Sequence, residues 1–319
     1  MRSAAVELLR LQAGKDCHLL MRIWISISAQ CIEIYGTHNA LIRRFPVSTA
    51  ANGAGEVSGS YRTPRGRHVV RAKIGGGVPE NTVFVRRRPT GEIWTPELAS
   101  ANPGRDWILT RILWLSGKEP GLNRLGEVDT MRRYIYIHGS PDAVAMGVPG
   151  SIGCIRMRNR DIVELFDLVP AYTSVDIVEY DVEDGDWTRL GSLVGPVRES
   201  VFVREQGVPA DMEYDDWDLH SLHAMARGPG GEPIGTGRLL PDGHIGRVAV
   251  LPAWRGKGVG EALMTRLMNE AMRRGNRSVV LNSQASAIDF YRKLGFEPQG
   301  PGFMEAGIPH QEMVCSLSG

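Results

Sequence analysis

The sequence predicts two domains in series, a mostly β domain followed by an α/β domain. Its 319 residues exceed one ordinary core, and a hydrophobic content of 42% is enough for two. Short strands and turns fill the first half, whereas strands alternate with amphipathic helices in the second. The charge also changes sign. Residues 1–180 carry 23 Lys and Arg against 17 Asp and Glu (+6), and residues 181–319 carry 14 against 19 (−5).

The first half is predicted to hold several short strands and one helix. Runs of alternating or β-branched residues predict strands over 23–34, 40–47, 68–74, 83–87, 134–138 and 174–180. A helix is expected over 161–169, because an apolar stripe lies between a candidate N-cap, Asn159, and the helix-ending Pro170. This pattern is typical of a β domain with a single supporting helix.

The second half begins with an acidic segment, 181–186, which we interpret as a solvated connector. Helices are predicted over 194–205, 258–274 and 285–294, and strands over 222–226, 234–240, 246–251 and 278–282. We therefore expect an N-terminal extension over 1–20, a first domain over 21–182 and a second over 183–319.

The start of the chain is apolar over 19–31, but Arg22 interrupts the run and its isoleucines alternate at the period of a strand. We accordingly expect neither a signal peptide nor a membrane span, and Met21 is an alternative start to Met1. The charge asymmetry favours an anionic ligand for the first half and an amine for the second, and we expect no nucleic-acid partner.

Cysteine spacing argues against two kinds of site. The four cysteines lie far apart and form no C-x-x-C pair of the type that zinc sites and redox motifs use; they are Cys17, Cys31, Cys154 and Cys315. Neither a metal nor a disulfide framework is expected.

One pair of residues in the first half suggests nucleophilic catalysis. His138 ends a predicted strand, and Cys154 follows in a glycine-containing turn. A cysteine attacks as thiolate, so a nearby imidazole is its usual base. Gly153 would let substrate approach backbone N–H donors, and Arg156 would hold a substrate carboxylate. Gly139 would let its own carbonyl orient the imidazole. The alternative is a packed cysteine and histidine without catalysis, because sequence spacing does not report spatial distance.

The residues around this pair resemble the signature of the L,D-transpeptidase (YkuD-like) family. The matching residues are Ile137-His138-Gly139, then Ser151-Ile152-Gly153-Cys154-Ile155-Arg156-Met157, followed by Asn159 and Asp161. Residues 46–49 and 63–66 are also similar to the family, so the resemblance covers about residues 22–180.

The resemblance implies a small β-sandwich that acts on bacterial peptidoglycan. Cys154 would attack the stem tetrapeptide at its third residue, D-alanine would leave, and the acyl-enzyme would pass to an amine or to water. His138 would be the base and Gly139 the orienting carbonyl. Ser151, Gly153 and Cys154 would form the loop that binds oxyanion and substrate.

One position departs from the family. Many members have histidine where this chain has Ile152, which donates no hydrogen bond, and we expect activity to survive in weakened form. The alternatives are an L,D-carboxypeptidase that uses water, or a degenerate module that binds peptidoglycan fragments without turnover.

A second constellation lies in the other half, where a predicted strand meets a glycine-rich turn and a helix. Such a junction gathers free N–H groups and a positive helix end, both of which favour phosphate. The candidate residues are Val248, Val250, Arg255, Gly256, Lys257, Gly258, Val259 and Gly260. Together with Asn282 and Tyr291 they resemble the GNAT acetyltransferase superfamily. That resemblance implies acetyl-coenzyme A as co-substrate and a fold with a mixed central sheet.

Tyr291 would then be the acid that protonates the coenzyme A thiolate as it leaves. The flanking segments 201–209 and 303–310 are similar to the ElaA-like branch, and the match covers about residues 190–313. Glu213, Glu305 and His310 are candidate bases for the acceptor amine, whose identity stays open. Because acetyl-coenzyme A is cytoplasmic, we expect a cytoplasmic protein acting on soluble muropeptides, with the periplasm as the alternative.

Overall fold

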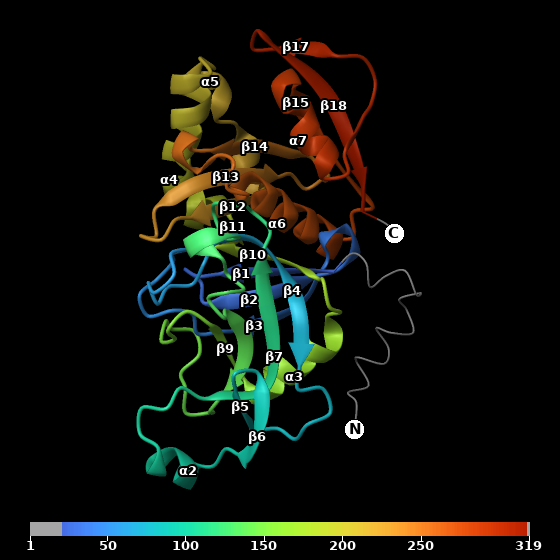
Figure 1. The fold of residues 1–319 in the computed structure, drawn as a ribbon. Helices are drawn as coiled ribbons and strands as arrows, with labels where there is room; N and C mark the ends of the chain where they lie inside the picture. Colours follow the sequence, from blue (N-terminus) through green and yellow to red (C-terminus); the bar gives the residue numbers. More distant parts are fainter. Residues whose placement is uncertain (1–20, 318–319) are drawn as a thin grey trace. The chain divides into compact units, whose positions relative to one another are not determined.

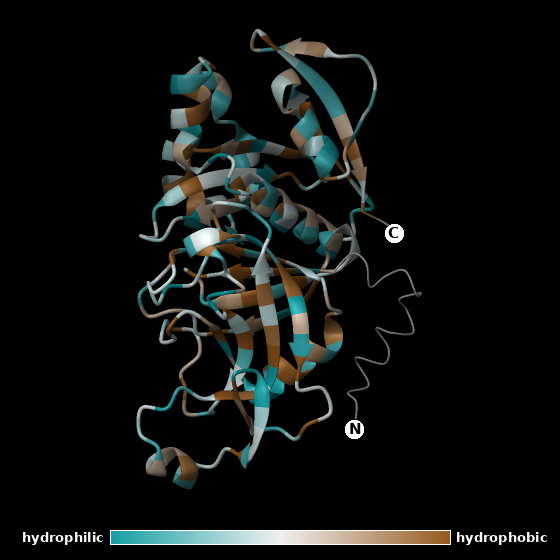
Figure 2. Ribbon diagram, viewed as in Figure 1, coloured by the Kyte–Doolittle hydropathy of each residue, from teal (hydrophilic) through white to brown (hydrophobic). Residues whose placement is uncertain are grey.

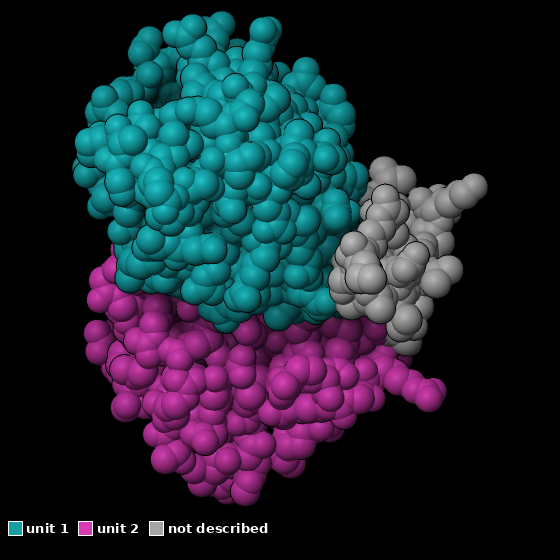
Figure 3. All heavy atoms as spheres, turned by 90° about the horizontal axis from the view of Figure 1, so that it is seen from below, with its two compact units in different colours: residues 1–179 teal, residues 180–319 magenta. Residues whose placement is uncertain are grey.

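The computed structural model describes residues 21–317, and the chain divides into two compact units between Glu179 and Tyr180 (Figure 3). The extension predicted over residues 1–20 lies outside the described residues. The first unit is rich in strands and the second combines strands with helices (Figure 1). The predicted fold class of two domains, mostly β and then α/β, is confirmed.

Ten strands and two helices build the first unit over residues 21–179. They are β1 (Arg22–Ser26), β2 (Cys31–Tyr35), β3 (Leu41–Pro46), β4 (Gly66–Ile74), β5 (Thr82–Val85), β6 (Arg88–Ile93), α2 (Pro96–Ala101), β7 (Ile108–Gly117), β8 (Tyr136–Ser140), β9 (Ile155–Arg158), α3 (Asn159–Leu168) and β10 (Ser174–Val178). Short 3₁₀ turns, η2 (Thr37–Asn39) and η3 (Gly126–Val128), lie in the connections.

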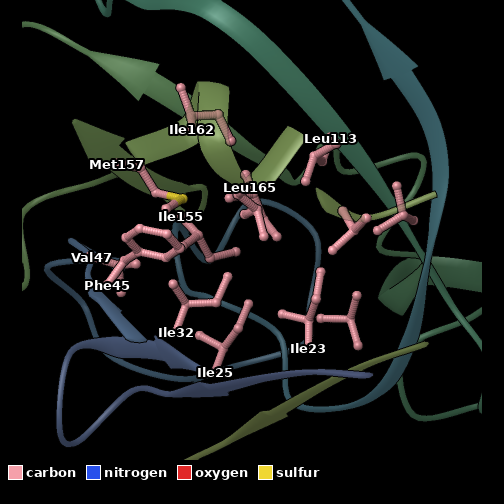
Figure 4. Packing of buried hydrophobic residues seen from close by; sticks show 14 of the residues in the cluster. Ile23, Ile25, Ile32, Phe45, Val47, Leu113, Ile155, Met157, Ile162 and Leu165 are labelled. Atoms are coloured by element: carbon pink, nitrogen blue, oxygen red, sulfur yellow. The ribbon is translucent and has the colours of Figure 1, made fainter. Parts of the chain in front are cut away.

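The ten strands form one mixed sheet that encloses a single large core. Its order is β3-β2-β1-β10-β4-β7-β5-β6, with β8 paired to β7 and β9 paired to β8. Side chains from both ends of this order meet inside, and Figure 4 shows Ile25, Ile32 and Phe45 facing Ile155 and Met157. Helix α3 closes the core with Ile162 and Leu165. Such sandwich-like packing holds β8 and β9 rigidly, because their inward residues are fully buried.

Several predicted elements of this unit need correction. The strand predicted over 23–34 is a hairpin of β1 and β2, and Gln30 at its turn has a positive φ of 49°. Asn159 is not the N-cap of α3 but its first residue, and Arg158 precedes it without a side-chain cap. Strands β6, β7 and β9 were not predicted at all. The apolar run of β7 is prominent in brown in Figure 2.

The second unit contains eight strands and several helices. The strands are β11 (Asp181–Gly185), β12 (Leu222–Arg227), β13 (Pro233–Leu239), β14 (Ile245–Val250), β15 (Ser278–Gln284), β16 (Glu297–Pro298), β17 (Phe303–Glu305) and β18 (Ile308–Ser316). The helices are α4 (Trp187–Arg198), the π-helix η4 (Glu199–Glu205), α5 (Ala210–Glu213), η5 (Asp216–His220), η6 (Pro252–Trp254), α6 (Val259–Arg273), η7 (Ala285–Ala287) and α7 (Ile288–Lys293).

Two four-stranded sheets diverge in this unit. One has the order β11-β12-β13-β14, and the other joins β15, β18 and β16 with β17 on β18. A single parallel bridge, His244 with Val280, links the two sheets. Beyond that bridge the strands β14 and β15 are not paired, which leaves room for a ligand between them. Helix α6 packs on the first sheet through Leu263, Met264 and Leu267.

Two predictions for this unit are wrong. The acidic segment 181–186 is not a connector, because residues 181–185 form the edge strand β11 and pair with β12. The helix predicted over 194–205 begins earlier, at Trp187, and changes to π-helical turns at Glu199. Within residues 21–317, no helix combines the length and the apolar character that crossing a bilayer requires.

Candidate active sites

The first site lies on the parallel strand pair β8–β9. The register sets His138 opposite Arg156, and Ile137 opposite Ile155. Because side chains alternate along a strand, Ile137 and Ile155 enter the core while His138 and Arg156 point to the other face. Cys154 lies in the bend just before β9 and packs against Ile112 and Tyr136. Ile112 is opposite His138 in the β7–β8 pair, and Tyr136 is two residues before it, so Cys154 and His138 lie on the same face of the sheet.

His138 is fully buried, and its two ring nitrogens differ sharply in environment. Nδ1 lies 2.8 Å from the carbonyl oxygen of Gly139, and since a carbonyl only accepts, Nδ1 carries the hydrogen. Nε2 is buried and has no hydrogen-bond partner within residues 21–317. Burial lowers the pKa of His138, so the ring is neutral at physiological pH and Nε2 offers a free lone pair. This is the state that a general base requires.

Gly139 is required by close packing rather than by a turn. It lies within β8 and has no positive φ. A Cβ at this position would lie 2.4 Å from Oδ1 of Asn159 and 2.8 Å from the carbonyl of Leu109. Asn159 itself accepts a hydrogen bond from Thr110 and donates one to Asn81. The glycine therefore lets helix α3 approach the strand whose carbonyl orients His138.

Cys154 is partly buried beside the strand that carries the histidine. Its Sγ lies 3.4 Å from the backbone nitrogen of Tyr136 and 3.5 Å from the carbonyl oxygen of Tyr134. Burial, with a smaller contribution from the charge of Asp106, raises the pKa of the thiol to about 12, although the N–H of Tyr136 and the charges of Arg156 and Arg133 lower it. The thiolate expected from the sequence is thus not the resting form. The sulfur is a protonated thiol, and no hydrogen bond joins it to His138 in the described part of the chain.

The loop before Cys154 is held from both sides. Gly153 has φ of +132°, a conformation that other residues rarely adopt. Its carbonyl accepts from the Thr63 hydroxyl at 3.0 Å, and its N–H donates to Oγ of Ser151 at 3.1 Å. Ser151 in turn donates to the carbonyl of Cys154 at 2.5 Å. Ile152 points outward and is 56% exposed, so it contributes no hydrogen bond to the loop.

Arg156 has a partner that the sequence did not predict. Its guanidinium donates to the carbonyl of Gly150 at 2.9 Å and to Oδ1 of Asp106 at 2.6 Å. The sequence predicts a substrate carboxylate at Arg156, but the carboxylate of Asp106 already occupies that position. Asp106 lies in the loop before β7, and no motif in the sequence marks it.

The second site is a cleft of about 630 Å³ between the diverging strands β14 and β15. Eight of the predicted residues line this cleft, namely Glu213, Val248, Val250, Arg255, Asn282, Tyr291, Glu305 and His310. The predicted residues of the glycine turn do not line it, namely Gly256, Lys257, Gly258, Val259 and Gly260. The π-helix η4 contributes Val201, Phe202 and Glu205, which the prediction of the site omitted. Local π-helical turns are frequent at functional sites.

Tyr291 sits on α7 with its ring against two phenylalanines. Its centroid lies 4.9 Å from that of Phe290 and 5.9 Å from that of Phe296. Burial raises the pKa of the phenol to about 12, which keeps its proton in place at neutral pH. A neutral phenol with a retained proton is suited to protonating a departing anion.

The glycine turn leads into helix α6, and one arginine of this region is already paired. Gly258 is the N-cap of α6 with φ of +81°. Arg255 donates to both carboxylate oxygens of Glu205 at 2.7 Å and to the carbonyl of Val250 at 2.9 Å. Hydrogen bonding from Arg255 lowers the pKa of Glu205, so the pair is ionised. The arginine expected at the phosphates is bound in a two-pronged contact within the chain.

The three candidate bases differ in availability. Glu213 is buried, pairs with Arg198 at 2.6 Å, and lies 3.4 Å from Arg247. Burial raises the pKa of Glu213, although both arginines lower it. Glu305 is exposed on β17 and His310 is half-buried on β18, where its Nδ1 donates to the carbonyl of Ile308 at 2.8 Å. The ion pairs hold Glu213 in place, whereas Glu305 and His310 carry no ion pair among residues 21–317.

Comparison with known proteins divides the chain in the same way. Residues 21–177 match the model of the L,D-transpeptidase catalytic domain, and residues 201–317 match the model of the acetyltransferase (GNAT) domain. The uncharacterised N-acetyltransferase YjcF of Bacillus subtilis is 39% identical over 122 residues, covering 37% of this chain and 86% of that protein. The UPF0039 protein C11D3.02c of Schizosaccharomyces pombe is 37% identical over 127 residues, covering 38% and 84%. The solved structure of Escherichia coli ElaA is 28% identical, covers 43% of this chain and 99% of its own, and has a TM-score of 0.40.

Proposed function

Because the chain belongs to the L,D-transpeptidase catalytic-domain family through residues 21–177 and to the GNAT acetyltransferase family through residues 201–317, we propose that it is a bifunctional acyltransferase. The first unit forms an acyl-enzyme on Cys154 with peptidoglycan stem tetrapeptides. The second unit transfers an acetyl group from acetyl-coenzyme A to an amine. Neither reaction requires a metal in this proposal.

One observation carries the first assignment. The buried Nε2 of His138 has no partner within residues 21–317, although burial normally selects for paired polar atoms, and His138 lies on the face of the sheet against which Cys154 packs. The unpaired Nε2 of His138 is explained if this nitrogen accepts the proton of the Cys154 thiol. A packed, purely structural histidine would be expected to use both nitrogens, as His68 does with Gly66 and Thr130.

The protonation states determine how the reaction begins. Since the pKa of Cys154 is raised and that of His138 is lowered, no thiolate–imidazolium pair stands ready. Proton transfer from Sγ to Nε2 accompanies attack of the sulfur on the carbonyl carbon. His138 then protonates the leaving amine of D-alanine, which restores its neutral form for the second half-reaction.

Purified protein incubated with a disaccharide tetrapeptide tests this assignment by intact-mass spectrometry. We expect the tripeptide acyl adduct on the wild type and no adduct on Cys154→Ala. Absence of an adduct from every stem peptide, with binding retained, would instead support the alternative of a degenerate binding module. The carboxypeptidase alternative predicts free tripeptide as the sole product.

The second assignment rests on the cleft between β14 and β15. When bound there, acetyl-coenzyme A supplies the thioester that the acceptor amine attacks. Tyr291 is the candidate acid for the departing thiolate, and Glu305 and His310 are the accessible candidate bases. Val248, Val250 and Asn282 would contact the cofactor along the two strands, and the N–H groups from Gly256 to Gly260 would meet its phosphates at the start of α6.

Release of coenzyme A thiol from acetyl-coenzyme A, followed with a panel of amines and with muropeptides, tests this second activity. We expect turnover with at least one amine and slower turnover in Tyr291→Phe. We further propose that both reactions take place in the cytoplasm on soluble muropeptides, because acetyl-coenzyme A is a cytoplasmic co-substrate. Fractionation that recovers the protein from the periplasm would contradict this location.

A further inference from the structure

We infer that Asp106 is the binding residue for the acceptor amine in the first unit, so that this site recognises a substrate ammonium group where the sequence predicted recognition of a carboxylate. The inference rests on the proposed acyl-enzyme chemistry of Cys154. It concerns the second half-reaction, in which the acyl group passes to an amine or to water.

The ion pair of Arg156 and Asp106 presents its negative member to the substrate. The arginine side chain is 16% exposed, and its guanidinium is held by Asp106 and by the carbonyl of Gly150. The aspartate side chain is 36% exposed. Oδ1 of Asp106 accepts from Arg156, whereas Oδ2 has no hydrogen-bond partner within residues 21–317. A ligand that reaches this pair meets an available carboxylate oxygen before it meets the guanidinium.

The strand register places Arg156, the partner of Asp106, beside the candidate base. Arg156 is opposite His138 in the β8–β9 pair, and Cys154 lies two residues before Arg156. Asp106 bonds directly to Arg156, and its charge acts on both reactive groups, raising the pKa of His138 and that of Cys154. An ammonium group held at Oδ2 would therefore lie close to a thioester on Cys154.

The loop that carries Asp106 is fixed independently of this contact. Arg105 pairs with Glu92 at 2.8 Å, and its guanidinium lies 4.3 Å from the ring centroid of Trp107. Substitution of Asp106 consequently removes the carboxylate without releasing its loop. Glu92→Gln tests whether loosening this loop has an effect of its own, because Glu92 lies on β6, is equally exposed at 36%, pairs with Arg105 and has no contact with Arg156.

Transfer of the acyl group replaces the C–S bond of the thioester with a C–N bond to the acceptor. The acceptor ammonium loses one proton to solvent while a remaining N–H stays bound to Asp106. The amine nitrogen attacks the thioester carbonyl carbon, the C–N bond forms, and the C–S bond breaks. The second proton passes from the nitrogen through Nε2 of His138 to Sγ, and Cys154 leaves as a thiol. Water can replace the amine in this step, but it makes no charged contact with Asp106.

The test measures how the acyl-enzyme partitions between amine and water. Full-length wild type, Asp106→Asn, Asp106→Glu and Glu92→Gln would receive a tetrapeptide donor and increasing concentrations of glycinamide, and mass spectrometry would quantify the amide and hydrolysis products. We expect Asp106→Asn to lower the amide-to-hydrolysis ratio about tenfold or more, as loss of a charge-assisted hydrogen bond implies. This ratio is set after the adduct has formed, so it is independent of any change in the rate of adduct formation that loss of the Asp106 charge causes.

Three further readouts make the outcome decisive. Asp106→Glu should recover much of the amine preference, and Glu92→Gln should retain all of it. Hydroxylamine, which is largely uncharged at neutral pH, should be used equally well as acceptor by wild type and Asp106→Asn.

If Asp106→Asn forms the adduct slowly but keeps the wild-type ratio, the aspartate serves the donor half-reaction and the inference is wrong, although the proposed function stands. If wild type forms no adduct at all, the proposed function of this unit and the inference fail together.

Discussion

Burial has opposite consequences for reactivity in the two candidate sites. In the first unit burial raises the pKa of Cys154, and in the second it raises that of Tyr291, in each case to about 12. A nucleophilic thiol must lose its proton, so burial opposes its reaction and makes the neighbouring base His138 necessary. A phenolic acid must keep its proton until the leaving group departs, so burial already suits Tyr291. Desolvation by burial therefore makes a proton acceptor necessary beside Cys154, whereas Tyr291 needs no such partner.

The sites also differ in how they hold their arginines. The Arg156 side chain is 16% exposed and that of its partner Asp106 36%, whereas Arg255 and Glu205 are 42% and 39% exposed. An exposed ion pair contributes little and is screened by salt, so an incoming phosphate can displace Glu205 at small cost. The pair of Arg156 and Asp106 is harder to separate, because its arginine is largely buried. We therefore expect Arg156 to stay bound to its aspartate and Arg255 to exchange its glutamate for ligand.

Removing the base of the first site should have the largest effect. His138→Ala is expected to lower the rate of acyl-adduct formation on Cys154 by roughly 10³-fold, because a buried thiol then has no proton acceptor. Acetyl transfer by the second unit should be unchanged. The buried His68, which hydrogen-bonds through both nitrogens, offers the control His68→Gln. An equal loss of adduct formation in both variants would indicate a structural role for His138.

The protonation state of Cys154 can be measured directly. Because its pKa is raised to about 12, alkylation by iodoacetamide should rise with pH through pH 10 without reaching a plateau. At pH 8 the rate should be at least about a hundredfold below that of an unperturbed cysteine. Peptide mapping by mass spectrometry would assign the label to Cys154. A plateau near neutral pH would mean that a thiolate–imidazolium pair exists at rest.

Loss of the phenol should weaken the second site by a smaller factor. Tyr291→Phe is expected to lower kcat for acetyl transfer about tenfold to a hundredfold, with little change in KM for acetyl-coenzyme A. Tyr214→Phe is the matched control, since Tyr214 is a partly exposed tyrosine of the same unit that donates to the carbonyl of Gly195. A rise in KM with unchanged kcat would assign Tyr291 to cofactor binding.

The smallest effect should come from the exposed ion pair. Glu205→Gln frees Arg255 and is expected to lower KM for acetyl-coenzyme A by about two- to fivefold, with the difference shrinking at high salt. Glu199→Gln breaks a comparable exposed pair with Arg204 on the same π-helix and should leave KM unchanged. A higher KM in Glu205→Gln would show that the glutamate positions Arg255 for the phosphates.

Local sequence patterns account for much of the fold and for the members of each candidate site. Strands β4, β12, β13 and β14 and helix α6 follow from periodicity, because each carries enough alternating or stripe-forming residues to define its period. Strand β7 was missed despite ten residues, since its polar residues Thr110 and Arg111 interrupt an otherwise apolar run. Strand β11 was read as a connector because its acidic residues favour solvent, and only pairing with β12 makes it a strand.

The sequence by itself determined which residues are candidates for the chemistry, because His138, Cys154, Arg255 and Tyr291 stand in local patterns of strand, turn and helix. Tertiary structure alone decided their charge states and their partners. Desolvation and ion pairing depend on groups distant in the chain, and Asp106 and Glu205 lie about fifty residues from the arginines that they bind. Burial makes Cys154 a thiol where a free cysteine would be partly ionised, and no local pattern carries that information.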